Sequence, residues 1–174
     1  MKKIFNWIKL NSWDSRKLLR KKEFIPSDEY QQIYKSTSHS IMINGKQVEF
    51  PIRIKQLIFN SKFVVVALGF SASEDCGFKQ KWTKEIDEKW TNLHKSRQDS
   101  NVYCYTLEGN LIWQLDDFGY YSIEFVNAIS AQKIPGFKKL MNDFPNEEFL
   151  SANGFDNLII KLETGEIFDR FQGK

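Results

Sequence analysis

The sequence predicts an α+β protein that is mainly an antiparallel β-sheet of hairpins, with helices at the N-terminus and one inserted helix. Three observations lead to this class: a thirteen-residue pattern that occurs twice, an early Asn-Gly turn, and a helical stripe of large apolar residues. The repeated pattern runs from Asn101 to Trp113 and, without a gap, from Asn157 to Asp169. Each copy has the form of a strand, a turn with a glycine, and a returning strand.

The first segment, residues 1–36, is predicted to be a helical extension. Apolar residues recur with a rough helical spacing over 1–22. Further on, Ser27 precedes Asp28 and Glu29. A hydroxyl that caps free amide groups, followed by acids at the positive end of the helix dipole, is a helix-start signal. We expect this second helix to run through about Tyr34.

The segment 41–171 is predicted to be the sheet core. Asn44-Gly45 lies between strand-like residues and favours the positive φ angles of a type I′ turn. The apolar run Phe63–Leu68 is rich in β-branched residues, which is typical of a central strand covered on both faces. A strand from Tyr121 to Ile129 and a short helix from Gly136 to Phe144 should follow. No low-complexity linker divides the chain, so we expect one domain, 1–174.

The inserted helix is predicted over about 79–96. Trp82, Ile86, Trp90 and Leu93 recur at helical spacing, and charged residues fill the positions between them. The apolar stripe is expected to dock on the sheet. The alternative is that Trp82 and Trp90 stay partly open to a partner.

Composition and charge narrow the class of protein. The net charge is +3, with 25 basic and 22 acidic residues mixed along the chain, which argues against a general nucleic-acid binder. We read no signal peptide and no membrane span in the sequence, so a cytoplasmic location is expected. The thiols of Cys76 and Cys104 would then be reduced.

Motifs for catalysis or for cofactors are lacking in the sequence. His39 and His94 stand apart from cysteines and from each other, so no metal site is predicted. No phosphate loop, dinucleotide fingerprint or nucleophile elbow appears. The adjacent acid pairs point to different sides of a strand or helix and are interpreted as solvated surface charge. We therefore predict no catalytic residue, no cofactor and no enzyme activity.

One acidic pair differs from the others because aromatic residues surround it. Asp116 and Asp117 lie beside Phe118 and Tyr120. Acids among exposed rings can recognise a basic protein surface, since the rings supply buried area and the acids select the partner.

A family resemblance rests on the two repeats. They resemble the blade motif of pyrroloquinoline-quinone-type propellers, so the fold is expected to be single-blade propeller-like. A closer similarity is to small bacterial proteins with an early Asn-Gly hairpin, a Val-rich strand, a segment such as Asn101–Tyr103 with Gly109–Gln114, and a segment such as Leu162–Ile167. These are similar to the immunity proteins of contact-dependent growth inhibition and related polymorphic-toxin systems. The N-terminal extension and a charged insertion at about 75–99 depart from the pattern.

The resemblance implies a cytosolic inhibitor that binds and neutralises a cognate toxin domain by a stoichiometric protein–protein interaction, with neither nucleic acid nor membrane as partner. The aromatic anchors and steering acids of the expected partner-binding surface are Trp82, Asp87, Glu88, Trp90, Asp116, Asp117, Phe118 and Tyr120. The alternative is a protein-interaction or scaffold module of the bacterial cytosol without a toxin. A third possibility is an enzyme with a deep pocket. The oligomeric state is open, and an unpaired edge strand could form dimers or accept a strand from the toxin.

Overall fold

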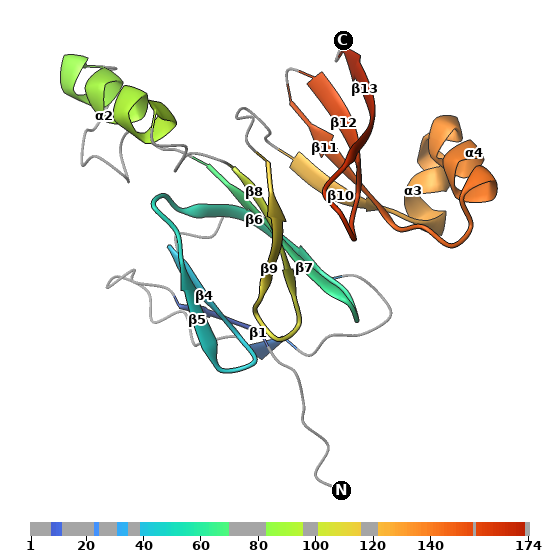
Figure 1. Ribbon diagram of the computed structural model, residues 1–174, viewed down its shortest axis with the longest axis horizontal. Coiled ribbons are helices and arrows are strands. Elements are labelled where there is room, and N and C mark those ends of the chain that lie inside the picture. The colour runs from blue at the N-terminus through green and yellow to red at the C-terminus, as the bar shows by residue number, and fades with distance from the viewer. Residues whose placement is uncertain are drawn as a thin grey trace, which may run out of the picture. The chain divides into compact units, whose positions relative to one another are not determined.

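The computed structural model divides the chain into two compact units, 1–118 and 119–174 (Figure 1). The expectation of a single domain stays a prediction. The residues that the structure describes are 8–11, 23–24, 31–34, 39–69, 83–95, 101–115, 122–154 and 156–172.

A five-stranded antiparallel sheet is the larger sheet of the first unit. Its order is β3-β6-β7-β8-β9. The strands are β3 (Gln31–Tyr34), β6 (Ile54–Phe59), β7 (Phe63–Leu68), β8 (Val102–Thr106) and β9 (Leu111–Gln114). All six residues of β7 are buried. The prediction of a central, doubly covered strand at 63–68 is therefore confirmed.

A second sheet of the first unit contains the Asn-Gly hairpin. Its order is β2-β1-β4-β5. The strands are β1 (Ile8–Asn11), β2 (Glu23–Phe24), β4 (Ser40–Ile43) and β5 (Lys46–Glu49). Asn44 and Gly45 have φ angles of 48° and 84° and form the two-residue loop between Ile43 and Lys46. Both central residues have positive φ, as a type I′ turn requires, so this prediction is confirmed.

The predicted helical extension over 1–36 is wrong wherever the structure describes it. Residues 8–11, 23–24 and 31–34 are strands, and the rest of the segment lies outside the described residues. β1 pairs with β4, and β3 pairs with β6. A short isolated helix is marginal in water. Pairing with strands later in the chain therefore outweighed the local helical spacing in these residues. Ser27, the expected helix start, lies outside the described residues.

The two sheets of the first unit share one hydrophobic core. Ile41 and Ile43 of β4 are buried with Val64 and Val66 of β7. The Phe50 ring closes one side of this core, with its centroid 5.4 Å from that of Tyr103 in an edge-to-face arrangement. Side chains alternate in direction along a strand, so one face of β7 supplies this core.

The inserted helix is present as α2 (Lys84–Lys95), while residues 79–82 and 96 lie outside the described part. Thr83 begins it: its hydroxyl accepts from the Ile86 N–H at 3.4 Å and its carbonyl accepts from the Asp87 N–H at 3.0 Å. Ile86, a member of the predicted apolar stripe, is fully buried. The helix prediction is confirmed over 84–95.

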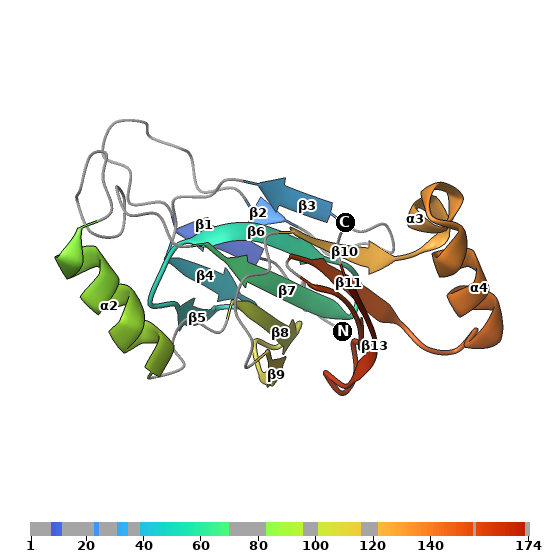
Figure 2. The ribbon, with the colours of Figure 1, turned by 90° about the horizontal axis from the view of Figure 1, so that it is seen from above.

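The second unit is a four-stranded antiparallel sheet in sequential order, β10-β11-β12-β13. The strands are β10 (Ser122–Val126), β11 (Phe149–Asn153), β12 (Asp156–Lys161) and β13 (Ile167–Gln172), and between β10 and β11 lie α3 (Ala128–Lys133) and α4 (Pro135–Asp143). The two helices lie next to each other in both ribbon views (Figure 2). The predicted helix at 136–144 is confirmed as α4.

Helix α3 was not predicted and replaces the end of the strand expected at 121–129. Asn127 stops the strand, because its side-chain oxygen accepts from the Ser130 N–H at 3.0 Å. In return, the Ser130 hydroxyl oxygen accepts from the Asn127 N–H at 2.8 Å. This reciprocal cap begins a helix immediately after Val126.

The two copies of the repeated pattern fold as the hairpins β8–β9 and β12–β13, which confirms that prediction. Gly109 and Gly165 both have a φ of 76°. Both hairpins have a β-bulge in their second strand. The bulged residues are Ile112 and Phe168, which occupy aligned positions and have no partner in the strand register. The turns differ by one residue, because the Thr106 N–H bonds the Asn110 carbonyl whereas the Lys161 N–H bonds the Glu166 carbonyl.

Two glycine substitutions should change stability in opposite directions. Gly109 has positive φ, and an added Cβ would meet Lys46 Cδ at 3.2 Å. We expect Gly109→Ala to destabilise the protein by about 1–2 kcal/mol, since an L side chain strains this conformation. Gly136 lies in α4 with open space around its Cβ position. Gly136→Ala should stabilise by about 0.5–1 kcal/mol. Denaturant unfolding of both variants measures the signs, and a stabilising Gly109→Ala would contradict the turn geometry.

Candidate functional site

Three of the predicted partner-binding residues lie on α2. Asp87 and Glu88 are exposed, and Trp90 is half-buried. Glu88 lies 3.9 Å from the Lys84 ammonium, and both side chains are well exposed, so this ion pair adds little stability. The other five predicted residues, Trp82, Asp116, Asp117, Phe118 and Tyr120, lie outside the described residues. Their proximity to α2 stays a prediction.

An edge strand of the second unit exposes large apolar side chains that the sequence analysis did not single out. Ile167, Phe168 and Phe171 of β13 are 40%, 37% and 45% exposed. We call these three residues the apolar edge. β13 is the last strand in the order of its sheet. An exposed, apolar edge strand is a template for pairing with another chain, and most proteins protect such edges.

The bulge in β13 determines where Phe168 points. Ile159 pairs with Asp169 and Ile160 pairs with Ile167, so Phe168 is the extra residue. The Phe168 ring lies 4.9 Å from the Phe144 ring and 5.3 Å from the Phe149 ring, both edge to face. A bulge can re-aim a side chain in this way. Here it joins an exposed ring to the core that α4 and β11 share.

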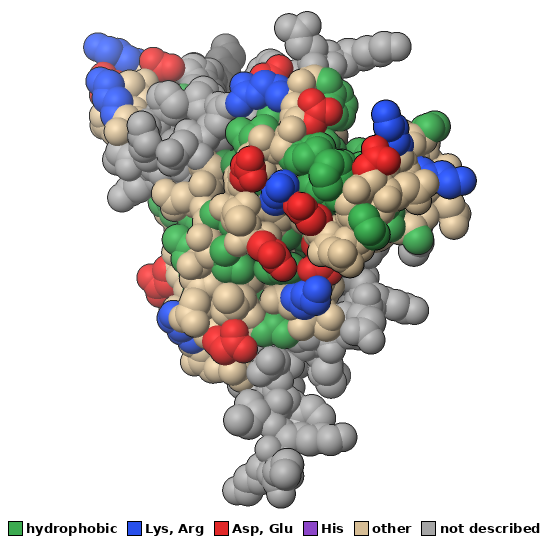
Figure 3. Space-filling view, turned by 45° about the vertical axis from the view of Figure 1, so that its right-hand side comes forward, with side chains coloured by type: hydrophobic (Ala, Val, Ile, Leu, Met, Phe, Trp, Pro, Cys, Tyr) green, Lys and Arg blue, Asp and Glu red, His purple; other side chains and the backbone are tan. Residues whose placement is uncertain are grey.

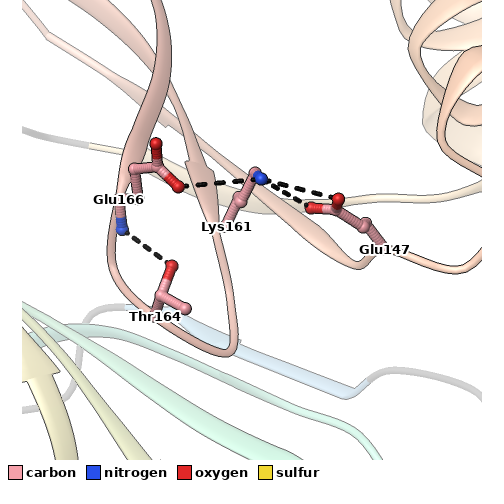
Figure 4. A network of polar contacts seen from close by, with 4 residues as sticks. All are labelled: Glu147, Lys161, Thr164 and Glu166. Atoms are coloured by element: carbon pink, nitrogen blue, oxygen red, sulfur yellow. Dashed lines mark hydrogen bonds and ion pairs between the residues drawn. The ribbon is translucent and has the colours of Figure 1, made fainter.

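A lysine and several carboxylates lie beside this aromatic cluster. The Lys161 ammonium is 3.1 Å from a Glu147 carboxylate oxygen and 3.6 Å from one of Glu166 (Figure 4). It also lies 5.7 Å from the centroid of the Phe168 ring. The Thr164 hydroxyl accepts from the Glu166 N–H at 3.2 Å and holds the turn that carries these groups. Charge pairing therefore fixes Lys161 over the edge of the apolar cluster.

The ion pairs change the titration of Lys161. The hydrogen bond to Glu147, and then the negative charges of Glu147 and Glu166, raise the pKa of the ammonium group. Its folded-state pKa thus exceeds the unfolded value of about 10.4. The resulting stabilisation is fully present below that pH and is lost as the pH rises through the folded-state pKa.

These charged groups line a depression of about 270 Å³ that we call the acidic pocket. Its lining residues are Glu147, Glu148, Lys161, Glu163, Thr164 and Glu166. Four glutamates surround one lysine, so the pocket keeps a surplus of negative charge. In Figure 3, Asp and Glu side chains lie next to hydrophobic side chains on the forward face. This combination suits a partner that brings both apolar and basic groups.

A second hollow lies between α3 and α4. Its volume is about 440 Å³, and its lining residues are Ala128, Ala131, Gln132, Pro135, Lys138, Met141 and Asn142. Most of these residues are small or apolar, and Lys138 is the charged one. Among the described residues, no cysteine, histidine or carboxylate lines this hollow.

The described residues offer little for catalysis. Cys104 is fully buried, and burial raises the pKa of its thiol far above the usual value, so it is held as an unreactive thiol. No three His, Cys, Asp or Glu side chains in the described part of the chain are arranged to hold a metal ion. Within the same residues, none of the helices combines the length and apolar character needed to cross a bilayer.

Comparison with known protein families, with curated proteins and with solved structures finds no match for this chain. The candidate function therefore depends on the surfaces described above. Sequence signals for the apolar edge do exist: Phe168 and Phe171 stand in the second strand of a duplicated hairpin near the end of the chain. The edge position that exposes them follows from the order of strands in the sheet, which no local pattern encodes.

Proposed function

We propose that this chain is an immunity protein, which binds a cognate bacterial toxin stoichiometrically and blocks its active site or its substrate path. The apolar edge is the observation that supports a binding function most directly. Three large apolar side chains within five residues of one edge strand, next to a carboxylate-rich pocket, favour association with another protein. The similarity of the repeats to immunity proteins supports the choice of a toxin as the partner.

We include the α2 surface in this proposal, with Asp87 and Glu88 as steering charges and Trp90 as an anchor. Large rings dominate interface energies, and acids outside the buried centre mainly set association rate and partner choice. Trp82 and the 116–120 segment, with Asp116, Asp117, Phe118 and Tyr120, complete the surface as predicted from the sequence. A cytoplasmic location of the chain also belongs to this proposal.

The sheet β10–β13 supports the proposed likeness to a propeller blade. Its four antiparallel strands follow one another in sequence order, as they do within each blade of a propeller. The strands of the whole chain form three sheets within the described residues, so the expected single-sheet form is wrong for the chain and applies to the second unit alone.

Co-expression with the gene encoded immediately upstream, which we expect to encode the toxin, tests the proposal. We expect cells that carry the intact chain to grow and cells without it to stop growing. The variant Trp90→Ala should weaken toxin binding by about 30-fold or more. The double variant Asp87→Lys with Glu88→Lys, which changes exposed side chains only, should weaken it by about tenfold. Binding is measured by titration of the purified toxin domain.

A matched control is Glu49→Lys, which makes the same acid-to-lysine change at one exposed position of β5 and so half the charge change of the double variant. It should leave toxin binding and growth protection unchanged. Circular dichroism of each variant separates loss of binding from loss of folding. If the toxin kills equally well with and without the intact chain, the proposed function is wrong.

A further inference from the structure

We infer that β13 is a docking strand, at which an extended basic segment of the partner adds a fifth strand to the sheet β10–β13. This inference takes one element from the proposed function, namely that the partner is a protein. Strand addition uses backbone hydrogen bonds for affinity and alternate side chains for specificity. The three features that carry it are the open edge, the surplus of negative charge beside it, and the poor fit of a second copy.

The edge is open and long enough for strand addition. Among the described residues, β13 pairs with β12 alone, and it is six residues long. Sheets usually protect such an edge with short strands, prolines or charges. This strand has no proline, its charged residues are Asp169 and Arg170, and its apolar edge is exposed.

The charge beside the strand selects a basic occupant. Lys161 already contacts Glu147 and Glu166, and the Arg170 guanidinium lies 3.2 Å from an Asp156 carboxylate oxygen. The local basic groups are therefore matched, while four of the six residues that line the acidic pocket are glutamates and one is a lysine.

By the strand register, Lys161 and Phe171 share one face of the sheet, and Ile167 lies on the other. A segment that alternates basic and apolar residues would place its basic side chains on the face of the pocket and its apolar side chains on the face of Ile167.

The surplus of negative charge distinguishes the β12–β13 hairpin from the β8–β9 hairpin. At the matching turn, the Lys46 ammonium donates to the Asn110 side-chain oxygen at 3.2 Å, and Glu108 is the acid of the turn. Leu111, the aligned counterpart of Ile167, is also exposed at the edge of its sheet. The two hairpins thus share an exposed edge and differ in the charge beside it, which supplies an internal control.

A second copy of the chain fits this edge poorly. When two identical antiparallel strands pair about a two-fold axis, one residue lies opposite its own copy. A register that uses most of β13 is centred on Asp169 or on Arg170. Either register places like charges directly opposite each other, which is destabilising. The strand therefore disfavours self-pairing and favours a different chain.

The test uses the full-length chain and a synthetic ten-residue peptide of alternating Lys and Val with blocked ends. Amide hydrogen exchange reports where the peptide binds, and fluorescence anisotropy reports its affinity. We expect exchange at amides within residues 167–172 to slow by about tenfold or more in the presence of the peptide. A peptide with Glu in place of Lys should bind at least about tenfold more weakly.

Paired variants test the charge and the apolar contact. Glu163→Lys changes an exposed acid of the β12–β13 turn, and Glu108→Lys makes the same change in the β8–β9 turn. Peptide affinity should fall about tenfold in the first variant and stay unchanged in the second. Likewise, Ile167→Ser should weaken binding severalfold, whereas Leu111→Ser at the aligned position should not.

Several outcomes would overturn the inference. These are absence of protection at 167–172, equal binding of the Glu-containing peptide, and equal effects of the Glu163 and Glu108 variants. Protection of 167–172 that rises with protein concentration and needs no peptide would assign the edge to a second copy instead. Loss of toxin neutralisation with peptide binding intact would reject the immunity function and leave this inference standing.

Discussion

Phe149→Ala should destabilise the protein by about 3–5 kcal/mol, the usual cost of removing a buried phenylalanine ring. Phe149 is only 2% exposed and lies in the core of the second unit with Phe137 and Ile159. Its ring also contacts Phe144 and Phe168 edge to face. The cavity left by the ring would remove these contacts together with the burial of the side chain.

The same variant tests whether the two compact units unfold as one domain. All five tryptophans of the chain lie in the first unit, 1–118, so tryptophan fluorescence reports on that unit alone. Trp113 is buried there and provides a sensitive signal. If 1–174 is one domain, as the sequence predicts, Phe149→Ala should shift the fluorescence and circular dichroism transitions in urea together.

Phe171→Ala is the matched control, because Phe171 lies in the same sheet and is 45% exposed. Phe171→Ala should change the free energy of unfolding by no more than about 0.5 kcal/mol. A Phe149→Ala variant whose fluorescence midpoint is unchanged while its circular dichroism transition splits would show that the units unfold separately. The single-domain prediction would then be wrong.

The parts of the fold that could be predicted are those encoded by residues close together in sequence. Asn44-Gly45 fixes a turn through its own φ angles, and the unbroken run 63–68 indicates burial on both faces. The duplicated pattern even carries the bulge, which occurs at the aligned residues Ile112 and Phe168. Each of these features can be recognised in the sequence without knowing which strand lies beside it.

The parts that could not be predicted depend on pairing over long distances. β1 and β3 are strands because β4 and β6 lie beside them, and their own residues have helix-like spacing. The residues of the candidate site likewise could be predicted only where a local pattern encodes them. Asp87, Glu88 and Trp90 were placed correctly on a helix, whereas the exposure of β13 depends on its being last in the sheet order.

Val65→Asp should have the largest effect of any single substitution considered, because it places an unpaired carboxylate in the centre of the five-stranded sheet. Val65 is fully buried on the central strand β7. Its register partners Ile58 and Cys104 are also fully buried. Full burial raises the pKa of a carboxyl group by up to about 3–5 units, and each unit corresponds to about 1.4 kcal/mol. About 3 pH units separate the unfolded pKa of about 3.9 from pH 7, so ionisation alone costs about 4 kcal/mol at pH 7, and the lost packing of the valine adds to this. A loss of this size is a large part of the stability of a typical domain.

The control for Val65→Asp is Leu111→Asp, which introduces the same charge on the edge strand β9 of the same sheet. Leu111 is 50% exposed, so water continues to solvate the introduced carboxylate there, and the loss should be below about 1 kcal/mol. Urea unfolding of both variants, measured against the parent chain at each pH, gives the comparison.

The dependence on pH separates the charge effect in Val65→Asp from simple loss of packing. The folded-state pKa of the introduced carboxyl lies above its unfolded value of about 3.9, so the folded chain binds its proton more tightly. The loss of unfolding free energy relative to the parent chain should therefore grow as the pH rises from about 4 to 7, and it should be smallest near pH 4. A packing defect would give a difference that is independent of pH. A pH-independent loss would assign the effect to packing alone and contradict the prediction. A loss equal to that of Leu111→Asp would mean that water reaches the position of Val65, which its zero exposure excludes.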